Sequence, residues 1–243
     1  MQNAYTLHNH WDDQRTSRVT SVKKRRFHPF YPGHHCFETR PEDNSAYVKV
    51  VPHLSPHTEL DAWTMDLVFN LTATNYEPAF VSYVAFDTEG SFKEVMSLYL
   101  PTGRLCPFYA EDAECLALYT GKEQSVGVPV RVTITGNMQG YFTYFDGEFY
   151  QKQDSGRKIP LGGSWVLGQF QRTVEGGFVQ NERFEGFVCD FQMWDFKMNE
   201  DQLKVLFSQD MKLKGNLFNS PPTYKKDLRH GALEHFEKVF EDH

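Results

Sequence analysis

The stretch VPVRVTITGNMQGYFTYFDG, residues 128–147, contains two strand-like runs with a turn between them. From Val128 to Ile134 every second residue is apolar and the residues between are more polar, which is the period of a strand with one face in a core. A turn containing glycine and asparagine follows at residues 136–140, and the second run leads into the tight-turn pair Asp146-Gly147. The stretch therefore predicts an antiparallel hairpin that buries one face.

Short runs of the same kind recur along the chain, each bounded by turn residues. They lie at residues 46–51, 63–72, 80–86, 95–100, 165–168 and 187–194. Many short strands separated by turns are typical of a sandwich, and an aromatic content of 15% suits the half-buried surface of a sheet. We expect an all-β fold, a two-sheet antiparallel jelly-roll sandwich, with Trp63, Trp165 and Trp194 as core anchors.

Two helices are expected as well. A short one should follow the last core strands, because Asn199 and Gln202 are spaced as in a capping box and residues 203–207 place apolar side chains on one face. A second, C-terminal helix is indicated by the helical spacing of Leu233, Phe236, Val239 and Phe240. So short a helix is marginal alone in water, so its apolar stripe must be buried.

The chain divides into an extended arm at 1–35, a sandwich at 36–218 and a tail at 219–243 that carries the C-terminal helix. The arm shows no hydrophobic period and ends in basic, aromatic and proline residues, which favour an extended course along a surface. We expect the arm to contact other protein subunits of an assembly or of a homo-oligomer. The C-terminal helix would either do the same or dock on its own sandwich. The contact residues would be Lys23, Lys24, Arg25, Arg26, Phe27, Phe30 and Tyr31 in the arm, and Leu233, Phe236, Val239 and Phe240 in the tail.

The net charge of −7 is unevenly distributed. Residues 1–35 carry six basic and two acidic residues, a net +4, which leaves −11 on residues 36–243. Because a body with this negative charge repels phosphates, we expect neither nucleic acid nor an anionic membrane as a partner. No run of about 18 apolar residues predicts a membrane span. Because the N-terminus lacks the apolar core of a secretory signal, we favour an intracellular location; the alternative is a mature extracellular form.

Two segments carry a resemblance to a known family. Residues 161–169, LGGSWVLGQ, resemble the pentraxin strand that leads into the calcium loop, and residues 186–196, GFVCDFQMWDF, resemble the family's Gly–strand–Met-Trp-Asp segment. The helix at 200–207 follows as in pentraxins, and residues 37–48 are similar to the family's first strand. The resemblance covers residues 36–207, and laminin-G domains share a looser version of it. It implies a concanavalin A-like lectin sandwich that binds rather than catalyses.

The resemblance also shows where this chain departs from calcium-binding pentraxins. The family places acidic ligands at the positions of Phe170, Arg172, Val179 and Glu182 here, and further ligands near Phe92 and Lys93. Calcium needs several hard oxygen ligands, and only Glu182 keeps one. We therefore expect no calcium, no other metal and no cofactor.

The cysteines leave two interpretations open. The positions of the family's internal disulfide fall near Asp66 and Val132, so that bridge is absent. Cys106 and Cys115 flank a plausible hairpin and would face each other at disulfide distance, but two free cysteines suit the sequence equally well. The histidines before Cys36 offer soft ligands for zinc, yet no second spaced pair accompanies them, and we assign no metal site there.

Three functions compete. The first is a non-catalytic interaction or scaffold subunit held to its neighbours by its termini. The second is a secreted, calcium-independent lectin or pattern-recognition protein, in which aromatic residues of 141–150 or Phe170 stack on sugar rings; oxidised cysteines would favour it. The third, a glycan-processing enzyme, would need two carboxylates facing one sugar bond. Because no strand carries such carboxylates, and Asp190 and Asp195 suit a turn and a surface, we expect no catalytic residues.

Overall fold

The computed structural model of the protein describes twelve parts of the chain. They are residues 35–39, 47–50, 59–73, 78–86, 92–99, 106–108, 126–154, 156, 158–208, 213–217, 229–230 and 233–236. Residues 1–34, which make up nearly all of the predicted arm, lie outside them, and so do Val239 and Phe240 of the tail. The partner contacts predicted for these residues stay predictions. No helix in the described parts is long and apolar enough to cross a membrane.

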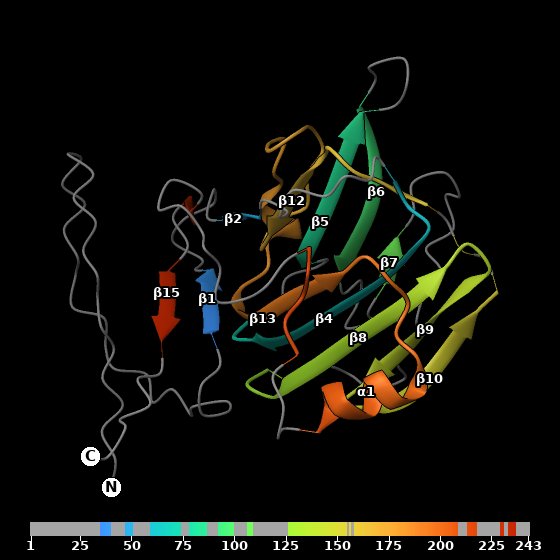
Figure 1. The fold of residues 1–243 in the computed structure, drawn as a ribbon. Coiled ribbons are helices and arrows are strands. Elements are labelled where there is room, and N and C mark those ends of the chain that lie inside the picture. Colours follow the sequence, from blue (N-terminus) through green and yellow to red (C-terminus); the bar gives the residue numbers. More distant parts are fainter. Residues whose placement is uncertain are drawn as a thin grey trace, which may run out of the picture.

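The fold is an antiparallel β-sandwich, as the sequence predicts (Figure 1). One sheet has the order β10 (Glu148–Gln153), β9 (Gly140–Phe145), β8 (Pro129–Asn137), β4 (Ala62–Leu71), β13 (Gly186–Trp194), β1 (His35–Thr39) and β15 (Leu233–Phe236). The other has the order β14 (Arg229–His230), β2 (Tyr47–Val50), β12 (Ser164–Leu167), β5 (Ala79–Phe86), β6 (Phe92–Tyr99) and β7 (Cys106–Phe108). A small pair, β3 (Glu59–Leu60) and β11 (Ile159–Pro160), completes the described strands.

The hairpin predicted at residues 128–147 is formed by β8 and β9, in which Asn137 lies opposite Gly140. Gly140 has a φ of 140°, and an added Cβ would lie 2.1 Å from the carbonyl oxygen of Gln153, so the turn requires glycine there. Val130, Val132 and Ile134 all lie in the core, as their alternation predicts. Val128 precedes the strand and is half exposed.

The core lies between the two sheets. Every second side chain of β4, from Trp63 to Leu71, enters it. Phe69 stacks on Phe80 of the opposite sheet with ring centroids 4.7 Å apart, and Trp165 stacks on Tyr83 at 4.2 Å. Burial raises the pKa of Tyr83 to about 12, although the Gly163 amide that donates to its oxygen opposes this shift. The Phe69–Phe80 stack thus joins the two sheets, whereas Trp165 and Tyr83 are neighbours within the six-stranded sheet.

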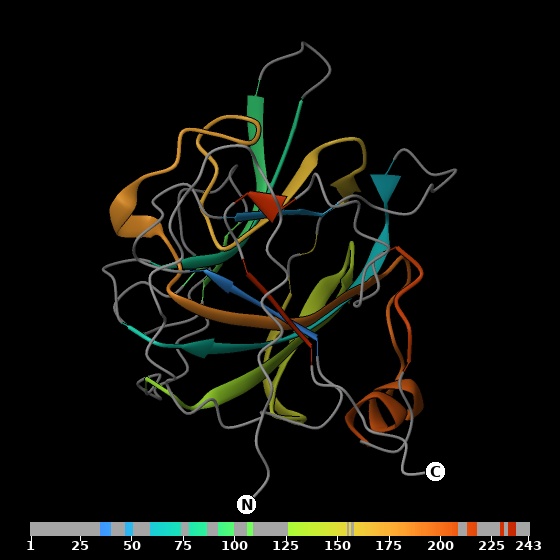
Figure 2. The same cartoon turned by 90° about the vertical axis from the view of Figure 1, so that its left-hand side faces the viewer.

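Helix α1 (Glu200–Phe207) lies on the face of the seven-stranded sheet that points away from the core (Figures 1 and 2). The capping box is present, since the Asn199 side chain accepts from the Gln202 amide and the Gln202 side chain accepts from the Asn199 amide. Leu203 and Leu206 pack with Trp194 and Met198 in a second cluster. Trp194 is thus buried under the helix, whereas Trp63 and Trp165 are buried between the sheets.

The prediction of a helix at the C-terminus is wrong over its first turn. Leu233–Phe236 form strand β15, which pairs antiparallel with β1 so that Leu233 lies opposite Glu38 and Phe236 opposite His35. Pairing with β1 satisfies backbone groups that an isolated short helix would have to satisfy alone. The described part of the tail therefore adds a strand to the chain's own sandwich.

A disulfide joins Cys36 of β1 to Cys189 of β13, residues that lie directly opposite each other in the pairing of these strands. Sequence reasoning missed this bridge, because it looked for partners near in sequence, and these two cysteines are 153 residues apart. Both are buried with Val68 and Phe187 on the outer face of the sheet. The alternative pair is not tested, because Cys115 lies outside the described residues.

We predict that peptide mapping of the unreduced protein links Cys36 to Cys189. Replacing both residues, C36S/C189S, should lower the free energy of unfolding by about 2–5 kcal/mol, because the bridge closes a long loop in the unfolded chain. Denaturant unfolding with and without reductant measures this loss. The same digest shows whether Cys106 and Cys115 are linked. Unchanged unfolding midpoints in the double variant would contradict the prediction.

Candidate functional site

The segment from β12 to β13, residues 168–185, is the place where the family resemblance puts a calcium loop. Both of its ends are fixed by backbone hydrogen bonds: the Gly168 amide donates to Phe80 (3.1 Å) and the Phe184 amide donates to Gly168 (3.1 Å). Gly168 has a φ of 91°, and a Cβ there would lie 2.5 Å from the Thr39 methyl carbon. The loop therefore leaves the sandwich through a narrow, glycine-dependent bend.

Gln171 holds the loop against the six-stranded sheet and is completely buried. Its side-chain nitrogen donates to the carbonyl oxygens of Ser82 and Ser164, both at 3.0 Å, while its side-chain oxygen accepts from the Glu175 amide at 2.8 Å. Ser82 and Ser164 are next to the core residues Tyr83 and Trp165, so they point to the opposite, outer face of their strands. The loop thus covers that outer face.

Polar and aromatic contacts extend this cover. Glu175 forms an ion pair with Lys49 of β2 (2.5 Å) and accepts a hydrogen bond from the Ser164 hydroxyl (3.1 Å). Phe178 packs on Tyr47, with ring centroids 4.8 Å apart. Burial and, to a smaller extent, the Glu175 carboxylate raise the pKa of Tyr47, which therefore stays protonated at neutral pH.

The residues that align with calcium ligands form an ion pair among themselves. The Arg172 guanidinium binds both carboxylate oxygens of Glu182, with Nε 3.2 Å from Oε2, and lies 5.6 Å from the centre of the Phe170 ring. Val179 supplies an apolar side chain, and the side chains of Phe92 and Lys93 lie outside the described residues. Because a guanidinium and an aromatic ring give Ca²⁺ no oxygen, this donor set does not fit the ion.

In the described parts of the chain, no group of three or more acidic, histidine or cysteine side chains has the arrangement of a metal site. The zinc alternative near the start of the sandwich loses a ligand, since the Cys36 sulfur is bonded to Cys189. Asp195, one of the two carboxylates near Trp194, is held by the Asn216 side chain (2.5 Å). Asp190 lies at a bulge of β13 with a φ of 48°.

Buried Asp66 and half-buried Arg131 form a polar cross-link close to the positions where the family has its disulfide. Both oxygens of Asp66 accept from Arg131, at 2.9 and 2.8 Å, and the Thr133 hydroxyl donates to Asp66 at 2.6 Å. The pairs Asp66–Thr133 and Leu67–Val132 are neighbours in the register of β4 with β8. Arg131 also lies 5.4 Å from the ring centre of Phe207 in α1. Polar contacts thus join these strands and the helix.

The aromatic run 141–150 splits between the two faces of its sheet. Tyr141 is buried, whereas Phe142 and Tyr144 point outward beside α1, and Phe149 of β10 is 58% exposed. The outward-facing rings of this run thus lie on strands β9 and β10. The alternation of the run was the signal that could have placed them.

The fold defines a lectin-type jelly-roll sandwich, and the described residues of this loop do not supply the donor set of a calcium site. The sequence model described as "Pentaxin family" matches residues 35–226. The chain belongs to the pentraxin family.

Relatives agree with this assignment. The chain is 35% identical over 79 residues to C-reactive protein of Danio rerio and 31% identical over 78 residues to jeltraxin of Lepidobatrachus laevis. Each match covers 31% of this chain and only 35% of the relative. A solved structure, the native heptameric SAP-like pentraxin of Limulus polyphemus, superposes with a TM-score of 0.66 at 16% identity, over 84% of this chain and 95% of that one.

We predict that Arg172→Gln loosens the loop without unfolding the sandwich. Amide hydrogen exchange should accelerate several-fold between residues 170 and 182. The free energy of unfolding should change by less than about 1 kcal/mol, since the Arg172 side chain is 55% exposed. Lys204→Gln removes an exposed ion pair of α1 and should leave exchange in the loop unchanged. Equal exchange in both variants would show that the Arg172–Glu182 pair does not hold the loop.

Proposed function

We propose that the protein is a non-catalytic, calcium-independent binding protein of the pentraxin family that works in an oxidising compartment. The observation that carries the proposal is the binding of Arg172 to Glu182 at the place of the calcium ligands. The internal guanidinium already compensates the one remaining carboxylate, so the loop is closed without a metal.

The oxidising compartment is supported by the Cys36–Cys189 disulfide, because such bridges persist mainly outside the cytosol. This favours the second of the three functions predicted from the sequence, a secreted calcium-independent lectin or pattern-recognition protein. It disfavours the intracellular location, which rested on the N-terminal sequence.

An enzymatic function has no support in the site. Asp190 and Asp195 are five residues apart on and after β13, and Asp195 is engaged by Asn216. Glu182 is held by Arg172. Glycoside hydrolysis requires two carboxylates that face one sugar bond, and the contacts of Asp195 and Glu182 with Asn216 and Arg172 do not provide such a pair.

A second function, that of an interaction subunit in an assembly, is compatible with the first. The solved Limulus relative is heptameric, which supports a homo-oligomer here. The arm, with its basic residues, and the acidic body suit contacts between neighbouring copies. The described part of the tail does not add to this support, because β15 pairs within its own chain.

We predict that Ca²⁺ has no measurable effect on the protein. Isothermal titration with millimolar Ca²⁺ should give no saturable heat, and the melting temperature should be the same in Ca²⁺ and in EDTA. Among the loop positions that align with calcium ligands only Glu182 carries a carboxylate, and Arg172 already binds it. A calcium-binding pentraxin measured in parallel is the positive control. A saturable signal, or a melting temperature that rises with Ca²⁺, would overturn the proposal.

We also predict that the protein is an oligomer at micromolar concentration. Light scattering after size exclusion should give a mass several times the 28.3 kDa of one chain. A variant lacking residues 1–32 tests the arm: it should keep the melting temperature of the sandwich but lose the assembly. A monomer of the full chain would refute oligomerisation, and an intact oligomer of the shortened chain would refute the role of the arm.

A further inference from the structure

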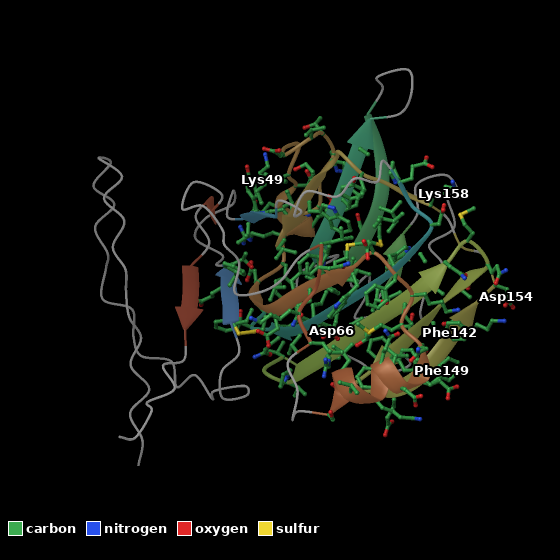
Figure 3. The ribbon with its side chains drawn as sticks, viewed as in Figure 1. Lys49, Asp66, Phe142, Phe149, Asp154 and Lys158 are labelled. Carbon is green, nitrogen blue, oxygen red and sulfur yellow. A yellow bond between two sulfur atoms is a disulfide. The ribbon has the colours of Figure 1, made fainter. Side chains whose placement is uncertain are left out.

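Three aromatic residues with contacting rings lie on the outer face of the seven-stranded sheet, and we call them the aromatic platform: Phe142, Tyr144 and Phe149. Phe149 of β10 lies opposite Tyr144 of β9 in the strand register. Its ring centre is 5.8 Å from that of Tyr144 and 6.3 Å from that of Phe142. Figure 3 shows Phe142 and Phe149 together beside α1, on the far side of the sheet from Lys49 and the loop 168–185. The platform is therefore separate from that loop.

The platform is held in place before anything binds. Tyr144 packs on Phe207 of α1, with ring centres 5.5 Å apart, and belongs to the cluster around Trp194. Phe149 rests against two rings of the neighbouring strand, yet 58% of it is exposed. An aromatic ring exposed to this extent but fixed by neighbours loses little conformational entropy when a ligand covers it. Such a surface is suited to stacking.

Hydrogen-bonding groups surround the platform. The Lys197 ammonium lies 4.5 Å from the centre of the Phe142 ring. None of the described residues forms an ion pair with this ammonium. Burial and the nearby Glu200 carboxylate raise the pKa of Tyr144, so its hydroxyl stays protonated and can donate at neutral pH. A ligand lying on the rings would thus meet an ammonium and a hydroxyl at their margin.

A partner strand is a poor occupant of this edge. β10 is the outermost strand of its sheet, but its pairing with β9 is shifted by an irregularity between Phe149 and Gln151. The second half of β10 carries Lys152, which is half exposed and forms an ion pair with Asp154. Bulges and charged side chains are the devices that keep edge strands from pairing with other chains. A ligand would therefore contact the aromatic rings of the platform rather than the backbone of β10.

A protein partner, including a second copy, would need a larger apolar area. Phe149 is the only strongly exposed large apolar side chain of β8, β9 and β10 in the described residues. It offers about 100 Å², given that an aromatic side chain buries roughly 150–250 Å². A stable interface covers about 800 Å² on each partner. The area fits a single small ring.

We propose that the aromatic platform binds a carbohydrate, with one sugar ring stacked by its apolar face on Phe149 and its oxygens hydrogen-bonded to Lys197 and Tyr144. Sugar rings present a face of C–H groups and a margin of oxygens, which matches a flat aromatic surface with donors at its edge. The inference deepens the proposed function, because it gives a calcium-independent binding protein a ligand class and a site.

The test uses the full-length protein on an array of defined neutral and acidic oligosaccharides, in EDTA, followed by titration of the oligosaccharide that binds most strongly. F149A should weaken binding about tenfold, the loss expected when one stacked ring is removed. V128A is the matched control, because Val128 is 51% exposed and lies before β8, outside the platform. F149W keeps a flat ring, so it should retain binding and change its fluorescence with the ligand. K197Q should also weaken binding.

Several results would overturn the inference. One is an array on which the wild-type protein binds nothing; another is an F149A variant that binds like the wild type. If F149A instead lowers the oligomer mass in light scattering, the platform is a contact between copies and not a sugar site. Equal melting temperatures of F149A and wild type show that the fold is intact. Binding that persists in EDTA but ignores F149A defeats this inference alone, whereas binding that requires Ca²⁺ defeats the proposed function.

Discussion

Strand β4 is buried on both faces, and the rest of the structure depends on how its buried polar side chains find hydrogen-bond partners. Its core side is apolar, but its outer side carries Thr64, Asp66 and Asn70, which are also buried. Buried polar groups need partners, because an unpaired one costs the free energy of its lost hydration. Thr64 and Thr135 share a hydrogen bond (2.7 Å), and both hydroxyls accept from the Met198 amide. Two of the buried threonines of the sheet therefore bind the segment that leads into α1.

The same requirement explains the position of the helix. Once Met198 is hydrogen-bonded to the two threonines, the capping box at Asn199 starts α1 directly above the sheet. The Trp194 indole then donates to the Lys214 carbonyl oxygen (3.0 Å), which fixes the chain that returns from the helix. Arg131 satisfies Asp66 while lying on Phe207. The helix also supports the aromatic platform, so the buried polar pairs and the proposed binding surface belong to one layer.

The outer face of the six-stranded sheet is covered by the loop 168–185 instead of a helix. On this face Ser82 and Ser164 alternate with the buried Val84 and Val166. Gln171 of the long loop donates hydrogen bonds to the carbonyl oxygens of both serines. The loop therefore has a structural function that does not depend on a metal. Arg172 and Glu182 join its two halves, so an ion pair takes the part that bound calcium would otherwise take. The loop is thus held by its own side chains.

The sequence by itself determined those features that follow from local periodicity or short spacing. The alternation after Val128 predicted a strand with one core face, and Asn199 with Gln202 predicted the start of α1, because strand periods and caps are decided within a few residues. The departures at Phe170 and Arg172 likewise led, from sequence alone, to the prediction that this loop lacks the ligands of a calcium site. Only the tertiary structure decided which distant residues meet. Cys36 lies opposite Cys189, and Leu233–Phe236 form a strand instead of a helix, because pairing with β1 provides the backbone hydrogen bonds of that segment. Phe149 joins Phe142 and Tyr144 through the register of two strands, and no spacing along the chain specifies which ring stays exposed.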